Sequence, residues 1–209
     1  DNHCDKADFE RFVDSVSKNL SNRSLYELQL LSAYHLAFSQ NACNFSVPGA
    51  GKTSVVYGAF AYLSNLPQED KKYVNRLLII SPLSAFGPWE SEYEECFGEK
   101  PSTRRLNGKV PIEEKKQYLY SLNPARITLL SCASVSALKD ELIYFLKNNK
   151  VMVVLDEAQN LSHKLGSPSA YILTEGRKFG WSAWFATQSL KILSDDEGVR
   201  LLQAAFKLY

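Results

Sequence analysis

The sequence predicts an α/β fold with a mainly parallel sheet that is flanked by helices on both faces. Apolar runs at 44–47, 76–81, 126–131, 151–155 and 182–187 alternate with helical patterns. Several runs are continuously apolar, as in strands covered on both sides, and strand–helix alternation favours parallel pairing with right-handed crossovers. Most of these runs end in polar residues, which predicts one ligand site at the carboxyl edge of the sheet.

Helices are predicted before, between and after these strands. Residues 5–20 place apolar side chains on one helical face, and a capping box at 24–27 is expected to open a second helix that runs through Ala37. Further helical patterns follow residue 53 and cover 112–122 and 135–147. The polar, glycine-bounded segment 98–108 predicts an exposed loop, and a weaker apolar run closes the chain at 204–209. We expect residues 1–24 to be a helical extension and 25–209 to be one domain.

Composition excludes several classes of protein. The 209 residues carry 24 Lys and Arg against 23 Asp and Glu, so there is no basic tail for nucleic acid. Four scattered cysteines without a C-x-x-C pair argue against a zinc ribbon and a disulfide framework. No stretch is long and apolar enough to span a bilayer and no signal peptide is evident. We therefore expect an intracellular protein, cytoplasmic or nuclear, without a membrane partner; a start at Asp1 indicates a fragment.

The segment 43–53 has the layout of a phosphate-binding loop. An apolar run breaks at a proline into a Gly-Ala-Gly turn, followed by Lys52, Thr53 and a helix. Glycines let backbone N–H groups converge on an anion, and the helix start adds its dipole. Lys52 would reach the β- and γ-phosphates of ATP, and the Thr53 hydroxyl would hold Mg²⁺. The predicted nucleotide-binding residues of this segment are Pro48, Gly49, Ala50, Gly51, Lys52, Thr53 and Ser54.

One position departs from the loop pattern G-x-x-x-x-G-K-[ST], because Ser46 stands where the first glycine belongs. An ordinary strand-to-helix turn that happens to contain Gly-Lys-Thr is the alternative. A second motif favours the phosphate loop: the apolar run 151–155 ends in Asp156 and Glu157. Two acids at an apolar strand end are costly unless they meet a cation or strong donors. Asp156 would bind Mg²⁺ and Glu157 would orient the attacking water.

Gln188 follows the next apolar run and is a candidate sensor of hydrolysis. A loop glutamine that bonds only to backbone is an equally open alternative.

An ordered series of motifs resembles the first RecA-like lobe of superfamily-two helicases, and among them the Swi/Snf-type DNA translocases. Leu25–Gln29 is similar to the family's L-x-x-Y-Q motif, with Leu28 in place of the tyrosine, and the resemblance implies that Gln29 contacts adenine. The segment from Pro82 fits P-L-S-x-x-x-x-W-x-x-E, with Trp89 and Glu92. Residues 156–159 form a D-E-A-Q variant of the D-E-A-H box. The resemblance implies nucleic-acid contacts, with DNA favoured, at Pro82, Leu83, Ser84, Ser131 and Ser134.

After residue 159 the resemblance changes. The segment 174–189 is more similar to hexameric DNA pumps of the HerA and conjugation type, in which Arg177 would act on a neighbouring subunit's nucleotide. A surface pair with Glu175 is the alternative for Arg177.

The motifs together predict the ATP-binding lobe of a nucleic-acid motor, with ATP and Mg²⁺ as cofactors. Its partner would be a second RecA-like lobe, which this chain lacks, or a neighbouring subunit, and hydrolysis by the isolated lobe would be slow. DNA would cross at a loop 82–89, although Trp89 has the alternative of anchoring that loop on the core. The rival hypotheses are a hexameric pump, a nucleotide-gated interaction module and, more remotely, a small-molecule kinase.

Overall fold

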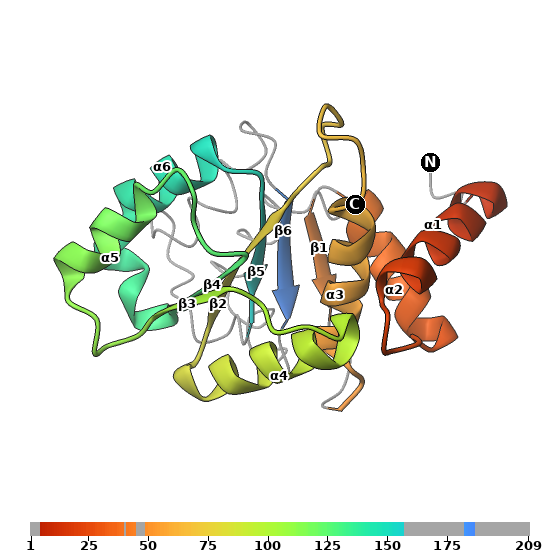
Figure 1. The fold of residues 1–209 in the computed structure, drawn as a ribbon, viewed down its shortest axis with the longest axis horizontal. Helices are drawn as coiled ribbons and strands as arrows, with labels where there is room; N and C mark the ends of the chain where they lie inside the picture. The colour runs from red at the N-terminus through yellow and green to blue at the C-terminus, as the bar shows by residue number, and fades with distance from the viewer. Residues whose placement is uncertain (1–4, 40, 45–48, 157–181, 187–209) are drawn as a thin grey trace, which may run out of the picture.

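A single parallel sheet forms the centre of the molecule (Figure 1). The computed structural model describes residues 5–39, 41–44, 49–156 and 182–186. Within them the strand order is β1-β6-β5-β2-β4-β3, and every pairing is parallel. The strands are β1 (Asn41–Asn44), β2 (Arg76–Ser81), β3 (Thr103–Leu106), β4 (Ile127–Ser131), β5 (Val151–Leu155) and β6 (Ser182–Ala186). The predicted α/β class with a parallel sheet is confirmed.

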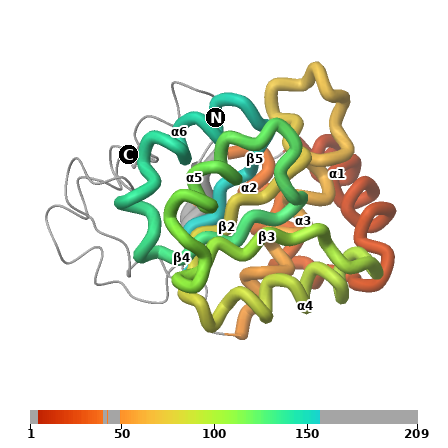
Figure 2. Tube along the Cα trace, turned by 60° about the vertical axis from the view of Figure 1, so that its left-hand side comes forward, coloured from red at the N-terminus to blue at the C-terminus, as the bar shows by residue number. Residues whose placement is uncertain are grey.

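Helices cover both faces of the sheet, because α5 and α6 lie on the side opposite α1, α2 and α3 in two views (Figures 1 and 2). The helices are α1 (Lys6–Asn19), α2 (Glu27–Phe38), α3 (Lys52–Leu63), α4 (Phe86–Phe97), α5 (Ile112–Leu119) and α6 (Lys139–Asn148). Short 3₁₀ turns are η1 (Leu83–Ala85), η2 (Cys132–Ser134) and η3 (Ser136–Leu138). None of the helices in the described ranges is both long and apolar enough to cross a bilayer.

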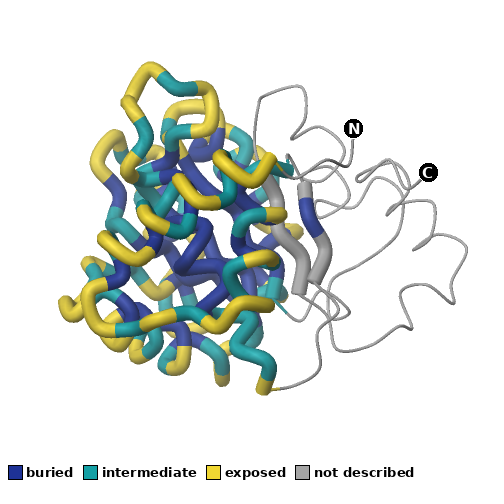
Figure 3. The backbone as a smooth tube through the Cα atoms, turned by 90° about the vertical axis from the view of Figure 1, so that its right-hand side faces the viewer, coloured by how far each residue is buried: buried dark blue, intermediate teal, exposed yellow. Residues whose placement is uncertain are grey.

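Alternate residues of each central strand enter different cores. Leu77 and Ile79 of β2 pack with α1–α4, whereas Leu78 and Ile80 pack with α5 and α6. This division follows from the two-residue period of a strand. All four side chains are fully buried, which explains why the β2 sequence is continuously apolar. Figure 3 shows buried residues, in dark blue, gathered in the interior of the described part, and exposed residues, in yellow, on its outer turns.

The N-terminal helix α1 belongs to the larger of these cores. Phe12 is fully buried and contacts the ring of Tyr34 edge-on at 5.5 Å and the ring of Tyr62 at 5.0 Å. Val16 and Leu20 join the same cluster. Although the sequence separates residues 1–24 as an extension, the described part of that segment packs directly on α2 and α3.

The segment 98–108 is not simply an exposed loop, because it contains strand β3. This strand pairs with β4 at the edge of the sheet. Of its four residues only Leu106 is buried, while Arg104 and Arg105 pair with Glu114 and Glu90. An edge strand with two charged residues lacks the apolar run that identifies the central strands.

Three further boundaries differ from the sequence prediction. Helix α2 begins at Glu27 rather than after Ser24, because the Gln29 side chain accepts the Tyr26 backbone N–H at 3.1 Å and so caps the helix. The first strand covers 41–44, whereas the predicted run 44–47 lies largely outside the described residues. The predicted loop 82–89 instead contains η1 and the first turn of α4, so Trp89 lies on a helix.

Candidate nucleotide site

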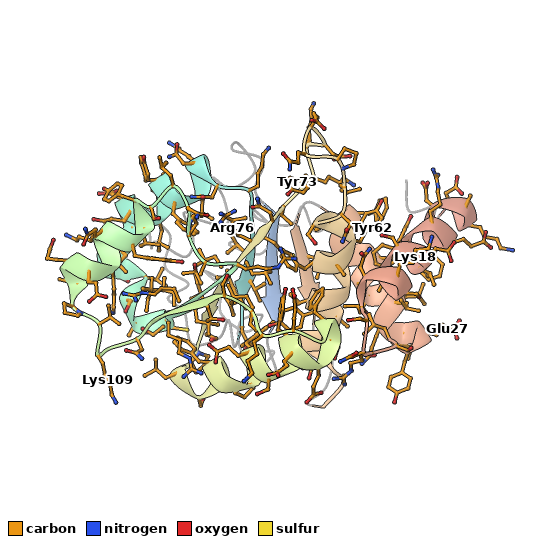
Figure 4. The ribbon with its side chains drawn as sticks, viewed as in Figure 1. Lys18, Glu27, Tyr62, Tyr73, Arg76 and Lys109 are labelled. Carbon is orange, nitrogen blue, oxygen red and sulfur yellow. The ribbon has the colours of Figure 1, made fainter. Side chains whose placement is uncertain are left out.

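The candidate site lies at the carboxyl edge of the sheet, where Ser81, Ser131 and Asp156 follow or end neighbouring strands. Ser81 and Ser131 are register partners, and the Asp156 backbone N–H donates to Ile80 O at 2.9 Å. In Figure 1 the arrowheads of β1 and β6 point to the edge along which α4 runs. The opposite edge is marked in Figure 4 by Arg76, the first residue of β2. The predicted convergence of strand ends is therefore present in the described strands.

The described part of the predicted phosphate loop, from Gly49 to the start of α3, contains two glycines in the left-handed region. Gly51 is the N-cap of α3 in the left-handed region, with φ of 74°, and the helix begins at Lys52. Gly49 has φ of 81°. Left-handed conformations are readily adopted only by glycine, so both glycines are needed for this turn. Thr53 and Ser54 lie in the first helical turn, where unpaired N–H groups and the helix dipole favour an anion.

Gln29 contacts this turn directly. Its side-chain amide donates to Ala50 O at 3.1 Å, while its carbonyl oxygen accepts the Tyr26 N–H. A Cβ atom on Gly51 would lie 2.3 Å from the Gln29 amide nitrogen. Gln29 therefore stabilises this turn by a hydrogen bond, and the adenine contact that the family resemblance implies stays a prediction.

Strand order places the loop and Asp156 in the same half of the sheet. Among the described strands, β6 alone lies between β1, which precedes the loop, and β5, which precedes Asp156. With neighbouring strands about 4.8 Å apart, the ends of β1 and β5 are separated by roughly 10 Å.

Helix α4 contributes two polar side chains that reach this region. The Trp89 indole N–H donates to Asp156 Oδ2 at 2.9 Å. Glu92 accepts a hydrogen bond from the Ser54 hydroxyl and forms an ion pair with Arg23 at 2.7 Å. The sequence motif includes Trp89 and Glu92 but does not predict these contacts. Their i, i+3 spacing is a usable signal, because residues three apart share one face of a helix.

The packing beneath α4 is aromatic and tight. Tyr57 of α3 is fully buried, meets the Trp89 ring edge-on at 5.6 Å and donates its hydroxyl to Trp89 O at 2.5 Å. Burial raises the pKa of the Tyr57 phenol well above its ordinary value, so this group is a neutral donor at physiological pH. Burial likewise raises the pKa of Cys96 to about 12, which keeps this thiol unreactive.

The residues predicted to contact nucleic acid divide into two groups. Leu83 and Ser84 are exposed on η1, beside the half-buried Pro82. Ser131 and Ser134 are buried, and their hydroxyls hydrogen-bond to each other at 2.9 Å. The Ser134 hydroxyl also accepts a hydrogen bond from Lys115 Nζ at 2.9 Å. Lys115 is buried, and the sequence does not single it out because it lies in a charged stretch. Any contact of these two serines with phosphate would thus compete with internal bonds.

Several predicted positions lie outside the described residues: Pro48, Glu157, Gln188, Arg177, Glu175 and the run 204–209. Within the described ranges, no cluster of three or more His, Cys, Asp or Glu side chains is arranged to hold a metal. The predicted metal ligands are instead one carboxylate and one hydroxyl, from Asp156 and Thr53, a pair that is not a cluster of that kind. No protein-family model matches the sequence, and comparison with curated proteins finds no match either.

Replacement of Gly51 by alanine is expected to disrupt this loop more than the same change at Gly49. Both glycines have positive φ, so each alanine carries backbone strain of about 1 kcal/mol. At Gly51 the added methyl group would also displace the end of the Gln29 side chain and its hydrogen bond to Ala50 O, whereas at Gly49 no atom of the described residues lies within 4 Å of it. Binding of Mg-ATP, measured by calorimetry, should fall at least several-fold further in Gly51→Ala. Equal losses in both variants would contradict the contact between Gln29 and the loop.

Proposed function

We propose that this chain is the ATP-binding and ATP-hydrolysing lobe of a nucleic-acid-dependent motor, with a RecA-like P-loop domain. The observation that supports this most is the juxtaposition at one sheet edge: a glycine turn that opens α3 at Lys52, and Asp156 two strands away. A phosphate loop alone occurs in many nucleotide-binding proteins. Its combination with an acidic strand end in the same half of a parallel sheet favours phosphoryl transfer.

The proposed roles follow from the chemistry of the side chains. The amides around Gly51 cradle the phosphates, and Lys52 adds a cation toward the β- and γ-phosphates. Thr53 and Asp156 offer a hydroxyl and a carboxylate, which are the hard oxygen donors that suit Mg²⁺. When bound, Mg²⁺ would neutralise negative charge on the phosphates. Glu157 would orient the attacking water.

The proposed nucleic-acid contact lies beside this site. The exposed turn η1 leads directly into α4, the helix that touches Asp156 and Ser54. Contacts there would address the sugar–phosphate backbone, so binding would show little sequence preference. In related phosphoryl-transfer reactions, loss of a trans-acting arginine lowers the rate about 10³- to 10⁵-fold. If this arginine comes from a second lobe or a neighbouring subunit, the 209-residue chain assayed alone should bind Mg-ATP and turn it over slowly.

The test is the rate of ATP hydrolysis by the purified chain, with and without duplex DNA, single-stranded DNA and RNA. We expect saturable Mg-ATP binding and turnover well below one per second. Turnover of several per second without any partner would contradict the need for an external arginine. The same measurement on a longer chain that contains a second lobe should show stimulation by one of these nucleic acids. Indifference to all of them would favour the nucleotide-gated interaction module.

A further inference from the structure

The hydrogen bond between Trp89 and Asp156 joins two segments that are distant in the sequence. Asp156 directly follows β5, and Trp89 lies in the first turn of α4. The indole N–H is a donor only, and it meets Asp156 Oδ2 at 2.9 Å, a normal hydrogen-bond length. A donor on one carboxylate oxygen restricts rotation of the carboxylate group.

Trp89 itself is buried, and both its ring and its backbone are in contact with α3. The side chain is 3% exposed, the Tyr57 ring packs against it edge-on at 82°, and the Tyr57 hydroxyl bonds to its backbone oxygen. Tyr57 belongs to α3, the helix that begins at the phosphate loop. The donor to Asp156 is therefore fixed relative to the same helix that carries Lys52 and Thr53.

Glu92, three residues after Trp89 on α4, contacts the first turn of α3. Its carboxylate accepts from the hydroxyl of Ser54, the residue after Thr53, and is itself held by Arg23 at 2.7 Å. Arg23 also forms an ion pair with Glu95 at 3.1 Å, so the segment between α1 and α2 contacts α4 through two carboxylates. Through Trp89 and Glu92, α4 therefore contacts both Asp156 and the residue that follows Thr53.

We infer that Trp89 is a positioning residue for Mg²⁺, which acts by orienting the Asp156 carboxylate toward the metal. This inference depends on the proposed function, because it assigns Asp156 to a Mg-ATP site. Partners that hold a metal-binding carboxylate contribute strongly to metal affinity: their loss typically costs 10- to 100-fold. Mg²⁺ demands near-ideal octahedral geometry, so it is sensitive to a misoriented ligand.

The test is Trp89→Phe, which retains an aromatic ring in the buried site and removes only the N–H donor and part of the ring system. In calorimetric titrations, the Mg²⁺ concentration that gives half-maximal ATP binding should rise about tenfold or more. ATP affinity in excess EDTA should be unchanged, because the phosphate loop is untouched. Mn²⁺, a less demanding ion, should be affected less than Mg²⁺.

Tyr93→Phe is the matched control. Tyr93 is buried one turn further along the same face of α4, and its hydroxyl accepts from Arg126 Nε at 2.8 Å, whereas Asp156 is held by Trp89. This variant should bind Mg²⁺ and ATP as the unmodified chain does.

Three results separate the ways in which the inference can fail. If Trp89→Phe has unchanged or tighter Mg²⁺ dependence, Trp89 does not position the metal. If affinity falls equally with Mg²⁺, Mn²⁺ and EDTA, or falls equally in Tyr93→Phe, the residue acts only through packing and the inference is also wrong. If the unmodified chain binds no Mg-ATP at all, the proposed function itself fails.

Discussion

Replacement of Lys52 by alanine is expected to weaken Mg-ATP binding by roughly 10- to 100-fold. Lys52 is the first residue of α3 and follows the left-handed Gly51, the position from which a lysine reaches the terminal phosphates. A hydrogen bond to a charged group contributes about 1.5–3 kcal/mol, and each 1.4 kcal/mol corresponds to about a tenfold change in affinity. Calorimetric titration with ATP and Mg²⁺ measures the loss directly.

Lys71→Ala is the control for the change in net charge. Lys71 is exposed in the turn before β2, at the opposite edge of the sheet from the candidate site. The variant removes one positive charge, as Lys52→Ala does, but at a distance from the loop. Salt screens the interaction between exposed charges that are more than about 10 Å apart. ATP affinity should stay within about twofold of the unmodified value at moderate salt. Equal losses in both lysine variants would contradict a phosphate contact by Lys52.

Phe60→Ala should produce the largest loss of stability among the predicted changes. Phe60 lies on α3, is fully buried, packs edge-on with Phe97 and has the Arg126 guanidinium 4.9 Å above its ring. Truncation of a buried phenylalanine typically lowers the free energy of unfolding by about 3–5 kcal/mol, because contacts are lost and a cavity remains. Since the proposed phosphate loop leads into α3, the variant should also bind ATP less well near its unfolding midpoint.

Tyr26→Ala is the matched aromatic truncation at the surface. Tyr26 is 78% exposed, so its removal should change the free energy of unfolding by no more than about 0.5 kcal/mol. Urea-induced unfolding followed by circular dichroism compares the two variants. A loss of less than about 1 kcal/mol for Phe60→Ala, far below the range for a buried phenylalanine, would show that α3 is not packed as described.

Patterns that depend on burial can be predicted well from the sequence. β2 and β5 lie at the predicted residues 76–81 and 151–155, because both are buried on two faces and carry no polar interruption. β3 escapes prediction since its burial is limited to Leu106. The sequence predicts a loop where α4 begins, because proline and glycine at 82, 87 and 88 are typical of loops. Pro88 is tolerated as the third residue of α4, where no intrahelical partner for its missing N–H is needed.

In the candidate site, too, some features can be predicted from the sequence and others cannot. Residues close together in sequence, such as Gly51, Lys52 and Thr53, can be identified because their spacing alone defines the turn and the helix start. The contact of Trp89 with Asp156 spans 67 positions of sequence and depends on how α4 crosses the sheet edge. Only the tertiary structure could reveal it. The burial of Lys115 with Ser134 is hidden for the same reason.

A structure of the chain crystallised with Mg²⁺ and a non-hydrolysable ATP analogue tests the central claim most directly. The claim is that the loop at Gly51 and the carboxylate of Asp156 form one site. We expect the triphosphate on the loop, with the Thr53 hydroxyl about 2.1 Å from Mg²⁺ and Asp156 bound to that ion directly or through water. A nucleotide bound elsewhere, or a metal with no link to Asp156, would contradict the account.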